Sequence, residues 1–300
     1  MIKFGTGGWR AIIGEEFTKE NIQKLALAMS LKIKAEHVED KPVVIGYDRR
    51  FLSKEAVIWS CEIFGQQGIK VLFVDRSSPT PLIMFYVMKH DLSYGMMVTA
   101  SHNPAIYNGI KVFTKGGRDA DEHQTADIER YLEQADKLYV PDLEENGQMP
   151  PHAYQELVKS GQVVEMNPMN EYLDNIISRI NLDAIRERDL RIAIDPMYGV
   201  SLTALCTILS IARCTVETIN AQHDTLFGGK MPAPTESTLR HLQNYVLDRY
   251  CDIGIATDGD ADRLGVIDDK GHYLHANTIL VMLYYYLLKY RGWRGPAVRN

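Results

Sequence analysis

Residues 253–267 read IGIATDGDADRLGVI, and this stretch joins two largely apolar runs through a loop that carries three carboxylates. Short apolar runs of this kind are typical of buried β-strands. In the acidic loop (residues 258–263), Asp258, Asp260 and Asp262 stand at alternate positions. Carboxylates with this spacing can converge on one hard cation, normally Mg²⁺ or Ca²⁺. The stretch therefore predicts a metal-binding loop between two strands of a sheet.

Two other interpretations of the acidic loop account for less of the sequence. A calcium-hand loop needs Gly at its sixth position and Glu at its twelfth, and these positions hold Arg263 and Asp269. A solvated acidic turn would not explain the strand-like runs on both sides. A site for one hard cation is therefore the favoured interpretation of the acidic loop, and its spacing alone leaves Mg²⁺ and Ca²⁺ open.

A second stretch, residues 94–104 with the sequence YGMMVTASHNP, places a hydroxyl in the same kind of position. Ser101 and His102 follow an apolar strand-like run on a tight turn. A Ser/His/Asp hydrolase would need the form G-x-S-x-G, but Thr99 and Asn103 occupy the two glycine positions. A hydroxyl beside a divalent cation is instead a good carrier for a phosphoryl group. Ser101 is therefore predicted to carry a phosphoryl group and to add an oxygen to the metal site.

Helix-like and strand-like segments alternate along the chain, which predicts an α/β fold. Near-continuous apolar strands favour mostly parallel, mixed sheets with helices on both faces. Pro and Gly interrupt the pattern between Pro141 and Pro151, so we expect two similar three-layer α/β/α domains joined by a linker there. Thr18 and Ser53 are predicted to cap the helices that follow them. Because ligands collect beyond the carboxyl ends of strands, the Ser101 loop and the acidic loop are expected to face one cleft.

Composition is that of an ordinary globular protein and excludes several kinds of partner. The net charge is −6 and the pI is near 5.9, so no nucleic-acid surface is expected. The four cysteines form no C-x-x-C pair and are interpreted as reduced core thiols. No signal-peptide region opens the sequence, and the longest apolar run, 279–288, is too short to span a bilayer. These features favour a cytoplasmic enzyme without nucleic-acid or membrane partners.

Three motifs together resemble the α-D-phosphohexomutases, the family of the phosphoglucomutases and phosphomannomutases. They are FGTGGWR at residues 4–10, SHNPAIYNGIK at residues 101–111, and DGDADR at residues 258–263. The first differs from the family's usual Gly-Thr-Ser-Gly-x-Arg form, because Gly7 stands where the family has Ser. The resemblance spans the whole chain, and the family normally continues well past residue 300.

The resemblance implies an isomerase that interconverts hexose 1-phosphate and hexose 6-phosphate. Phospho-Ser101 would donate its phosphoryl group to a hexose monophosphate, which gives a hexose 1,6-bisphosphate. The bisphosphate would turn over in the cleft and return its other phosphoryl group to Ser101. Mg²⁺ and a hexose 1,6-bisphosphate primer are the implied cofactors, and a hexose phosphate is the implied partner. The motifs do not decide between glucose, mannose and glucosamine, although the form of residues 107–109 leans toward the phosphoglucomutase/phosphomannomutase branch.

The resemblance also assigns roles to individual residues. Lys111 matches the family position proposed for the general acid/base, and His102 is the alternative. A phosphoserine carries about −2 and three Asp side chains about −3, so a divalent metal alone leaves an excess of negative charge that nearby cations must offset. The expected catalytic residues are Ser101, His102, Lys111, Arg10 and Arg263. The expected substrate-binding residues are Thr6, Arg10, Asn103, Lys111 and Arg263.

Two alternative functions stay open, a metal-dependent sugar-phosphate phosphatase and a non-catalytic phosphosugar-binding protein. The expected domains are a phosphoserine-loop domain at residues 1–150, a metal-loop domain at 151–272, and the opening helix of a third, sugar-binding domain at 273–300. Without the sheet that it normally covers, this helix would expose apolar side chains. Self-association through residues 273–300 is therefore predicted.

Overall fold

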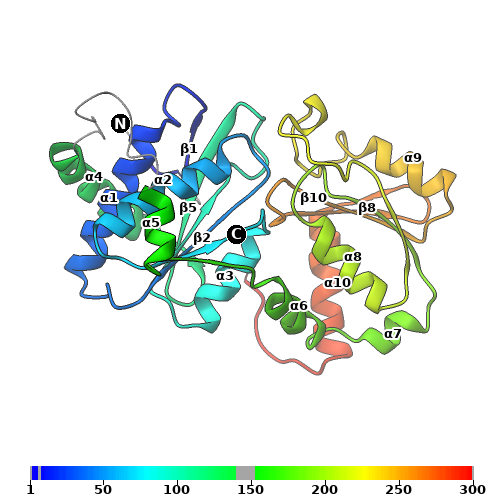
Figure 1. Ribbon diagram of the computed structural model, residues 1–300. Helices are drawn as coiled ribbons and strands as arrows, with labels where there is room; N and C mark the ends of the chain where they lie inside the picture. Colours follow the sequence, from blue (N-terminus) through cyan, green and yellow to red (C-terminus); the bar gives the residue numbers. More distant parts are fainter. Residues whose placement is uncertain (1, 6–7, 140–152, 299–300) are drawn as a thin grey trace.

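The computed structural model describes residues 2–5, 8–139 and 153–298, which form two units with one sheet each (Figure 1). The elements of the first unit are β1 (Trp9–Ile12), α1 (Lys19–Ala35), β2 (Val43–Tyr47), α2 (Ser53–Gln66), β3 (Val71–Val74), α3 (Thr80–Lys89), β4 (Tyr94–Val98), β5 (Tyr107–Thr114), β6 (Arg118–Asp119), α4 (Glu122–Leu138), α5 (Ala153–Lys159) and β7 (Val163–Met166). Those that follow are α6 (Met169–Ile177), α7 (Leu182–Arg186), β8 (Arg191–Asp195), α8 (Leu202–Ile211), β9 (Thr215–Thr218), a 3₁₀ turn (Phe227–Gly229), α9 (Arg240–Asp248), β10 (Ile253–Thr257), β11 (Leu264–Asp268), β12 (Tyr273–Leu274) and α10 (Ala276–Lys289).

The first sheet is mixed, with the strand order β1-β5-β4-β2-β3-β7 and with β6 beside β5. Strands β4, β2, β3 and β7 are parallel to one another, whereas β5 runs antiparallel to both of its neighbours β1 and β4. Val43 and Ile45 of β2 pack into the core that includes α1, α2 and α4, and Val44 packs toward α3 on the other face. Alternate strand residues thus serve opposite faces, which gives the three layers that the sequence predicts.

The second sheet repeats this design on a smaller scale, with the order β12-β11-β10-β8-β9. Strand β8 is parallel to β9 and β10, and β11 is antiparallel to β10. Ala193 of β8 packs toward α9, while Ile192 and Ile194 pack toward α8. In both sheets the parallel pairing expected from the sequence is found at the central strands, and the antiparallel pairing lies toward one edge.

Two local expectations have different outcomes at the ends of helices. Thr18 caps α1, because its side chain accepts from the backbone N of Asn21, as predicted. Ser53 does not cap α2. It is the first helical residue, and its hydroxyl donates to the buried carboxylate of Asp48 instead.

The boundary between the units lies later than the sequence pattern indicates. The predicted linker, 141–151, falls outside the described residues. Strand β7 lies beyond it, yet β7 pairs with β3 in the first sheet. The proposed division at residue 150 would separate a strand from its own sheet, so we propose to move the division to between β7 and α6.

Helix α10 forms where the sequence predicts the opening helix of a third domain, and none of its residues is buried. Among the described residues, no helix is both long and apolar enough to cross a bilayer. All four cysteines are free. Cys61 and Cys251 are buried as predicted, whereas Cys206 and Cys214 are only partly buried.

Candidate active site

The Ser101 loop and the acidic loop meet where the two units face each other. Strand β4 ends at Val98 and β10 ends at Thr257, so each loop leaves the carboxyl end of a central strand. Ser101 Oγ donates to Asp258 Oδ2 at 2.7 Å. Gly259 permits this approach, because a Cβ at its position would lie 2.8 Å from the carbonyl oxygen of Ser101. The two sequence motifs therefore form one site.

The carboxylates of the acidic loop form a group that fits a divalent cation. One ligand oxygen from each of Asp258, Asp260 and Asp262 lies within 4.8 Å of the other two. Asp260 is fully buried, yet no side chain or backbone donor among the described residues hydrogen-bonds its Oδ1. An unpaired buried carboxylate oxygen is costly, and carboxylate oxygens are ligands that Mg²⁺ prefers. These residues therefore fit the Mg²⁺ that the sequence predicts.

The surroundings of Asp258 and Asp260 shift the pKa values of these two residues in opposite directions. Burial raises the pKa of Asp258 to about 8, and the charges of Asp260 and Asp262 add to this shift. Burial also raises the pKa of Asp260, but the ammonium group of Lys111 outweighs burial and holds this pKa below its ordinary value. A bound cation favours the ionised form of every carboxylate it contacts. With all three carboxylates ionised, their negative charge exceeds the positive charge of Lys111, whose ammonium group contacts Asp260 and Asp262.

Lys111 reaches the acidic loop from β5. Its Nζ donates to Asp260 Oδ2 at 2.8 Å and to Asp262 Oδ2 at 2.6 Å. Burial lowers the pKa of Lys111, but the two carboxylates outweigh burial and raise it. Lys111 is charged here and can donate a proton rather than accept one.

His102 lies beside Ser101, and Arg10 contacts the same loop through Asn103. His102 Nδ1 lies 3.4 Å from Ser101 Oγ. Burial lowers the pKa of His102, and the charges of Arg263 and Arg10 lower it further, so the neutral imidazole is favoured. Arg10 Nη1 donates to Asn103 Oδ1 at 2.9 Å, which ties the first motif to the Ser101 loop.

Arg263 and Thr6 are the two remaining expected site residues, and the structure describes only Arg263. The backbone N of Arg263 donates to Asp258 Oδ1 at 2.9 Å, and its side chain extends from an exposed position. Arg263 can therefore contact a ligand without disturbing the acidic loop. Thr6 lies outside the described residues.

Thr80 is a site residue that sequence reasoning missed. It begins α3, and its hydroxyl donates to Asp260 Oδ2 at 2.6 Å. Its backbone N also donates to the backbone carbonyl oxygen of Asp260 at 2.9 Å. A threonine before Pro81 is an ordinary helix start, so no sequence signal separates this one from others.

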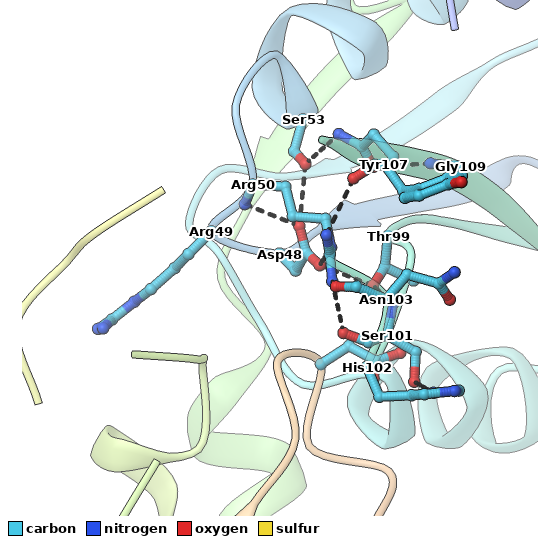
Figure 2. A network of polar contacts seen from close by, with 12 residues as sticks. Asp48, Arg49, Arg50, Ser53, Thr99, Ser101, His102, Asn103, Tyr107 and Gly109 are labelled. Atoms are coloured by element: carbon cyan, nitrogen blue, oxygen red, sulfur yellow. Dashed lines mark hydrogen bonds and ion pairs between the residues drawn. The ribbon is translucent and has the colours of Figure 1, made fainter. Parts of the chain in front are cut away.

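Sequence reasoning also missed a buried polar network next to the Ser101 loop (Figure 2). Asp48 and Arg50 follow β2 directly, and both are buried. Asp48 accepts from the hydroxyls of Ser53 and Thr99. The sequence feature that could have indicated this network is the charged segment 48–50, which follows the apolar strand β2. Its meaning depends on β2 lying next to β4, which no local pattern reveals.

Comparison with known proteins finds family matches for both segments that contain these loops. Residues 1–139 match the model of phosphoglucomutase/phosphomannomutase alpha/beta/alpha domain I, and residues 170–271 match that of domain II. The chain belongs to the α-D-phosphohexomutase family. The phosphohexomutase domain I contains the Ser101 loop, and domain II contains the acidic loop.

Individual relatives in this family carry several names. A Pyrococcus abyssi protein with the name probable phosphoglucosamine mutase is 32% identical over 98% of this chain and 59% of its own length. A Thermococcus kodakarensis phosphoglucomutase/phosphomannomutase is 29% identical over 96% of this chain and 60% of its own length. The crystal structure of a Thermus thermophilus protein, with the provisional name phosphomannomutase, matches with a TM-score of 0.83 and 26% identity, over 98% of this chain and 63% of that one. The chain thus spans about three fifths of the length of these curated relatives.

Proposed function

We propose that these two domains provide the phosphoryl-transfer centre of a phosphohexomutase that interconverts hexose 1-phosphate and hexose 6-phosphate. The observation that carries the proposal is the 2.7 Å hydrogen bond from Ser101 Oγ to Asp258, in a buried carboxylate group that fits Mg²⁺. Family membership supports the same activity. Because the chain covers only part of its relatives, the activity is proposed for the protein to which these domains belong.

Ser101 Oγ is the atom proposed to carry the phosphoryl group. In the first step, the bond between Oγ and phosphorus breaks while the free hydroxyl of a hexose monophosphate forms a new bond to phosphorus. The product is a hexose 1,6-bisphosphate. In the second step, the turned bisphosphate returns its other phosphoryl group to Ser101 Oγ. Mg²⁺ held by Asp258, Asp260, Asp262 and Ser101 would offset the negative charge that develops during transfer.

In the first step the sugar hydroxyl loses its proton, and Ser101 Oγ gains one as its bond to phosphorus breaks. In the second step the Ser101 hydroxyl loses that proton, and the sugar oxygen that leaves phosphorus gains one. His102 is proposed as the group that accepts the proton, because burial keeps its pKa low. Lys111 is proposed as the group that donates a proton, because its carboxylate partners keep it charged. Arg10, Arg263, Asn103 and Thr6 are proposed to bind the phosphate groups of the substrate.

The first prediction concerns the phosphoryl carrier. Wild-type protein incubated with glucose 1,6-bisphosphate is expected to gain about 80 Da, the mass of one phosphoryl group, whereas Ser101→Ala is not. Loss of Ser101 is also expected to abolish mutase turnover in the full-length protein, assayed with glucose, mannose and glucosamine 1-phosphates.

Ser210→Ala provides the matched control, since it removes the same hydroxyl at an exposed position of α8. It should load and turn over like wild type. Release of free phosphate without transfer between sugar positions would indicate a phosphatase instead. Activity of Ser101→Ala within about tenfold of wild type would contradict the covalent mechanism, because a phosphoryl carrier cannot be dispensable.

A further inference from the structure

Arg50 contacts four backbone carbonyl groups of the Ser101 loop (Figure 2). Its Nη2 donates to the carbonyl oxygens of Ser101 and Asn103, at 2.7 Å each. Its Nη1 donates to the carbonyl oxygens of Pro104 and Tyr107, at 2.9 Å each. One buried guanidinium group therefore holds the backbone of the loop at both of its ends.

Asp48 fixes the other side of the same serine. Thr99 Oγ1 donates to Asp48 Oδ2 at 2.7 Å, and the backbone N of Ser101 donates to Thr99 Oγ1 at 2.8 Å. Asp48 Oδ2 in turn lies 3.3 Å from Arg50 Nε. The amide and the carbonyl group of Ser101 are thus both tied to one buried ion pair.

This double attachment explains how Ser101 keeps an unfavourable backbone conformation. Its φ is 51°, in the left-handed region, which a residue other than Gly adopts only at a cost in energy. The same conformation directs Oγ toward Asp258. The ring of Phe227, from the second unit, lies 4.8 Å from the Arg50 guanidinium carbon. Packing from both units therefore confines the guanidinium group.

We propose that Arg50 is a positioning residue for phosphoryl transfer, which holds the Ser101 loop so that Oγ points at the metal site. The proposal rests on the proposed role of Ser101 as phosphoryl carrier. A guanidinium group suits this task because its two terminal nitrogens offer four N–H donors in a fixed fork. Lysine brings the same charge with a single nitrogen and three donors, so it cannot reproduce the four contacts.

The test compares Arg50→Lys with wild type in two measurements. The first is amide hydrogen exchange at Ser101, Asn103 and Tyr107, whose backbone N–H groups are all hydrogen-bonded within the loop region. The second is the rate at which Ser101 takes up a phosphoryl group from glucose 1,6-bisphosphate with Mg²⁺, followed by intact mass.

The expected result has two parts. Exchange at these amides should accelerate at least about tenfold, because local opening becomes easier. The maximal loading rate should fall on the order of 100-fold, which is the typical effect of misplacing a reacting group by about 1 Å. The bisphosphate concentration that gives half of the maximal rate should stay unchanged, because Arg50 does not contact the ligand.

Arg49 offers a matched control beside Arg50. Its Nη1 donates to the carbonyl oxygens of Tyr198, Ala221 and Gln222 in the second unit, and its side chain points away from the Ser101 loop (Figure 2). Arg49→Lys should leave exchange in the Ser101 loop unchanged. If Arg50→Lys does not fold, Thr99→Val takes its place in the test. This substitution removes only the link between Asp48 and the Ser101 amide, and it too is expected to accelerate amide exchange and to lower the maximal loading rate.

Each outcome decides between distinct possibilities. Wild type that never takes up a phosphoryl group would overturn the proposed function together with the positioning role. Wild type that loads, with Arg50→Lys loading at the same maximal rate, would overturn the positioning role alone, whether or not loop exchange or thermal stability changes. A fall in the maximal loading rate together with faster loop exchange supports the proposal.

Discussion

At the scale of single residues, the carboxylates of the acidic loop have partners on several other elements. The ammonium group of Lys111 contacts Asp260 and Asp262, and the hydroxyls of Thr80 and Ser101 donate to Asp260 and Asp258. These contacts compensate only part of the buried charge, since no donor in the described part of the chain reaches Asp260 Oδ1. The shortfall is what a divalent cation would supply.

We therefore expect removal of Mg²⁺ to stop phosphoryl loading of Ser101. EDTA should lower the loading rate on the order of 10³-fold, since metal ions typically contribute several kcal/mol to transition-state stabilisation. Added Mg²⁺ should restore the rate. Mg²⁺ should also raise the melting temperature of wild type by binding the folded state, and Asp260→Asn should lose this shift.

The control for this prediction is Asp269→Asn, which removes the same charge at an exposed position outside the group. It should keep both responses to Mg²⁺. A crystal structure with Mg²⁺ held by other residues, for example Glu122 and His123, would show that the acidic loop is not the metal site.

At the scale of elements, the pairing of β1 with β5 brings Arg10 into the site. Arg10 lies opposite Gly109 in this antiparallel pair, and Lys111 lies two residues further along β5. Gly109 has no room for a side chain, because a Cβ there would lie 2.1 Å from the carbonyl oxygen of Trp9 and 3.0 Å from that of Thr99. The close contact involves backbone atoms, which cannot relieve a clash by changing rotamer as a flexible side chain can.

Gly109→Ala should therefore destabilise the protein by on the order of 3 kcal/mol, the upper part of the usual range for overpacking. Urea unfolding followed by circular dichroism would measure the change. Gly5→Ala is the control, because the nearest atom to its added Cβ lies 3.8 Å away. A change below about 0.5 kcal/mol for Gly109→Ala, the size usual for surface substitutions, would mean that β1 and β5 separate easily.

At the scale of the whole molecule, α10 is an apolar helix without a partner among the described residues. Val281, Met282 and Leu283 are 68%, 57% and 52% exposed. Each apolar side chain of this size gains roughly 1.5–3 kcal/mol when it is buried. Contiguous exposed apolar surface of this kind favours association.

The 300-residue chain is therefore expected to self-associate through α10, as the sequence predicts. Leu283→Glu should shift the protein toward the monomer in sedimentation velocity experiments. Asn277→Glu adds the same charge at an exposed polar position of the same helix and should leave the distribution unchanged. A monomeric wild type at concentrations of about 100 μM would contradict the prediction, since an affinity weaker than this corresponds to less than roughly 5.5 kcal/mol.

The sequence by itself determined the features that depend only on neighbouring residues, such as the strands that precede the Ser101 loop and the acidic loop. Apolar runs predict β4 and β10 because a buried strand needs them, and the polar residues after each run mark the loops that hold Ser101 and Asp258. Thr18 was recognisable as a cap because capping involves only neighbouring residues. Such features are local, so they can be read without knowledge of the neighbours in space.

Only the tertiary structure decided which strands lie side by side, and the remaining site residues depend on that order. Arg50 holds the Ser101 loop because β2 lies next to β4, and Thr80 contacts Asp260 from a helix 180 residues away in the sequence. The same holds for β7, which joins the first sheet from beyond the predicted linker, and for Ser53, which bonds to Asp48 rather than capping α2. Periodicity reports that a side chain is buried, but burial alone does not identify its partner, because contacts between distant segments are set by the packing of the whole fold.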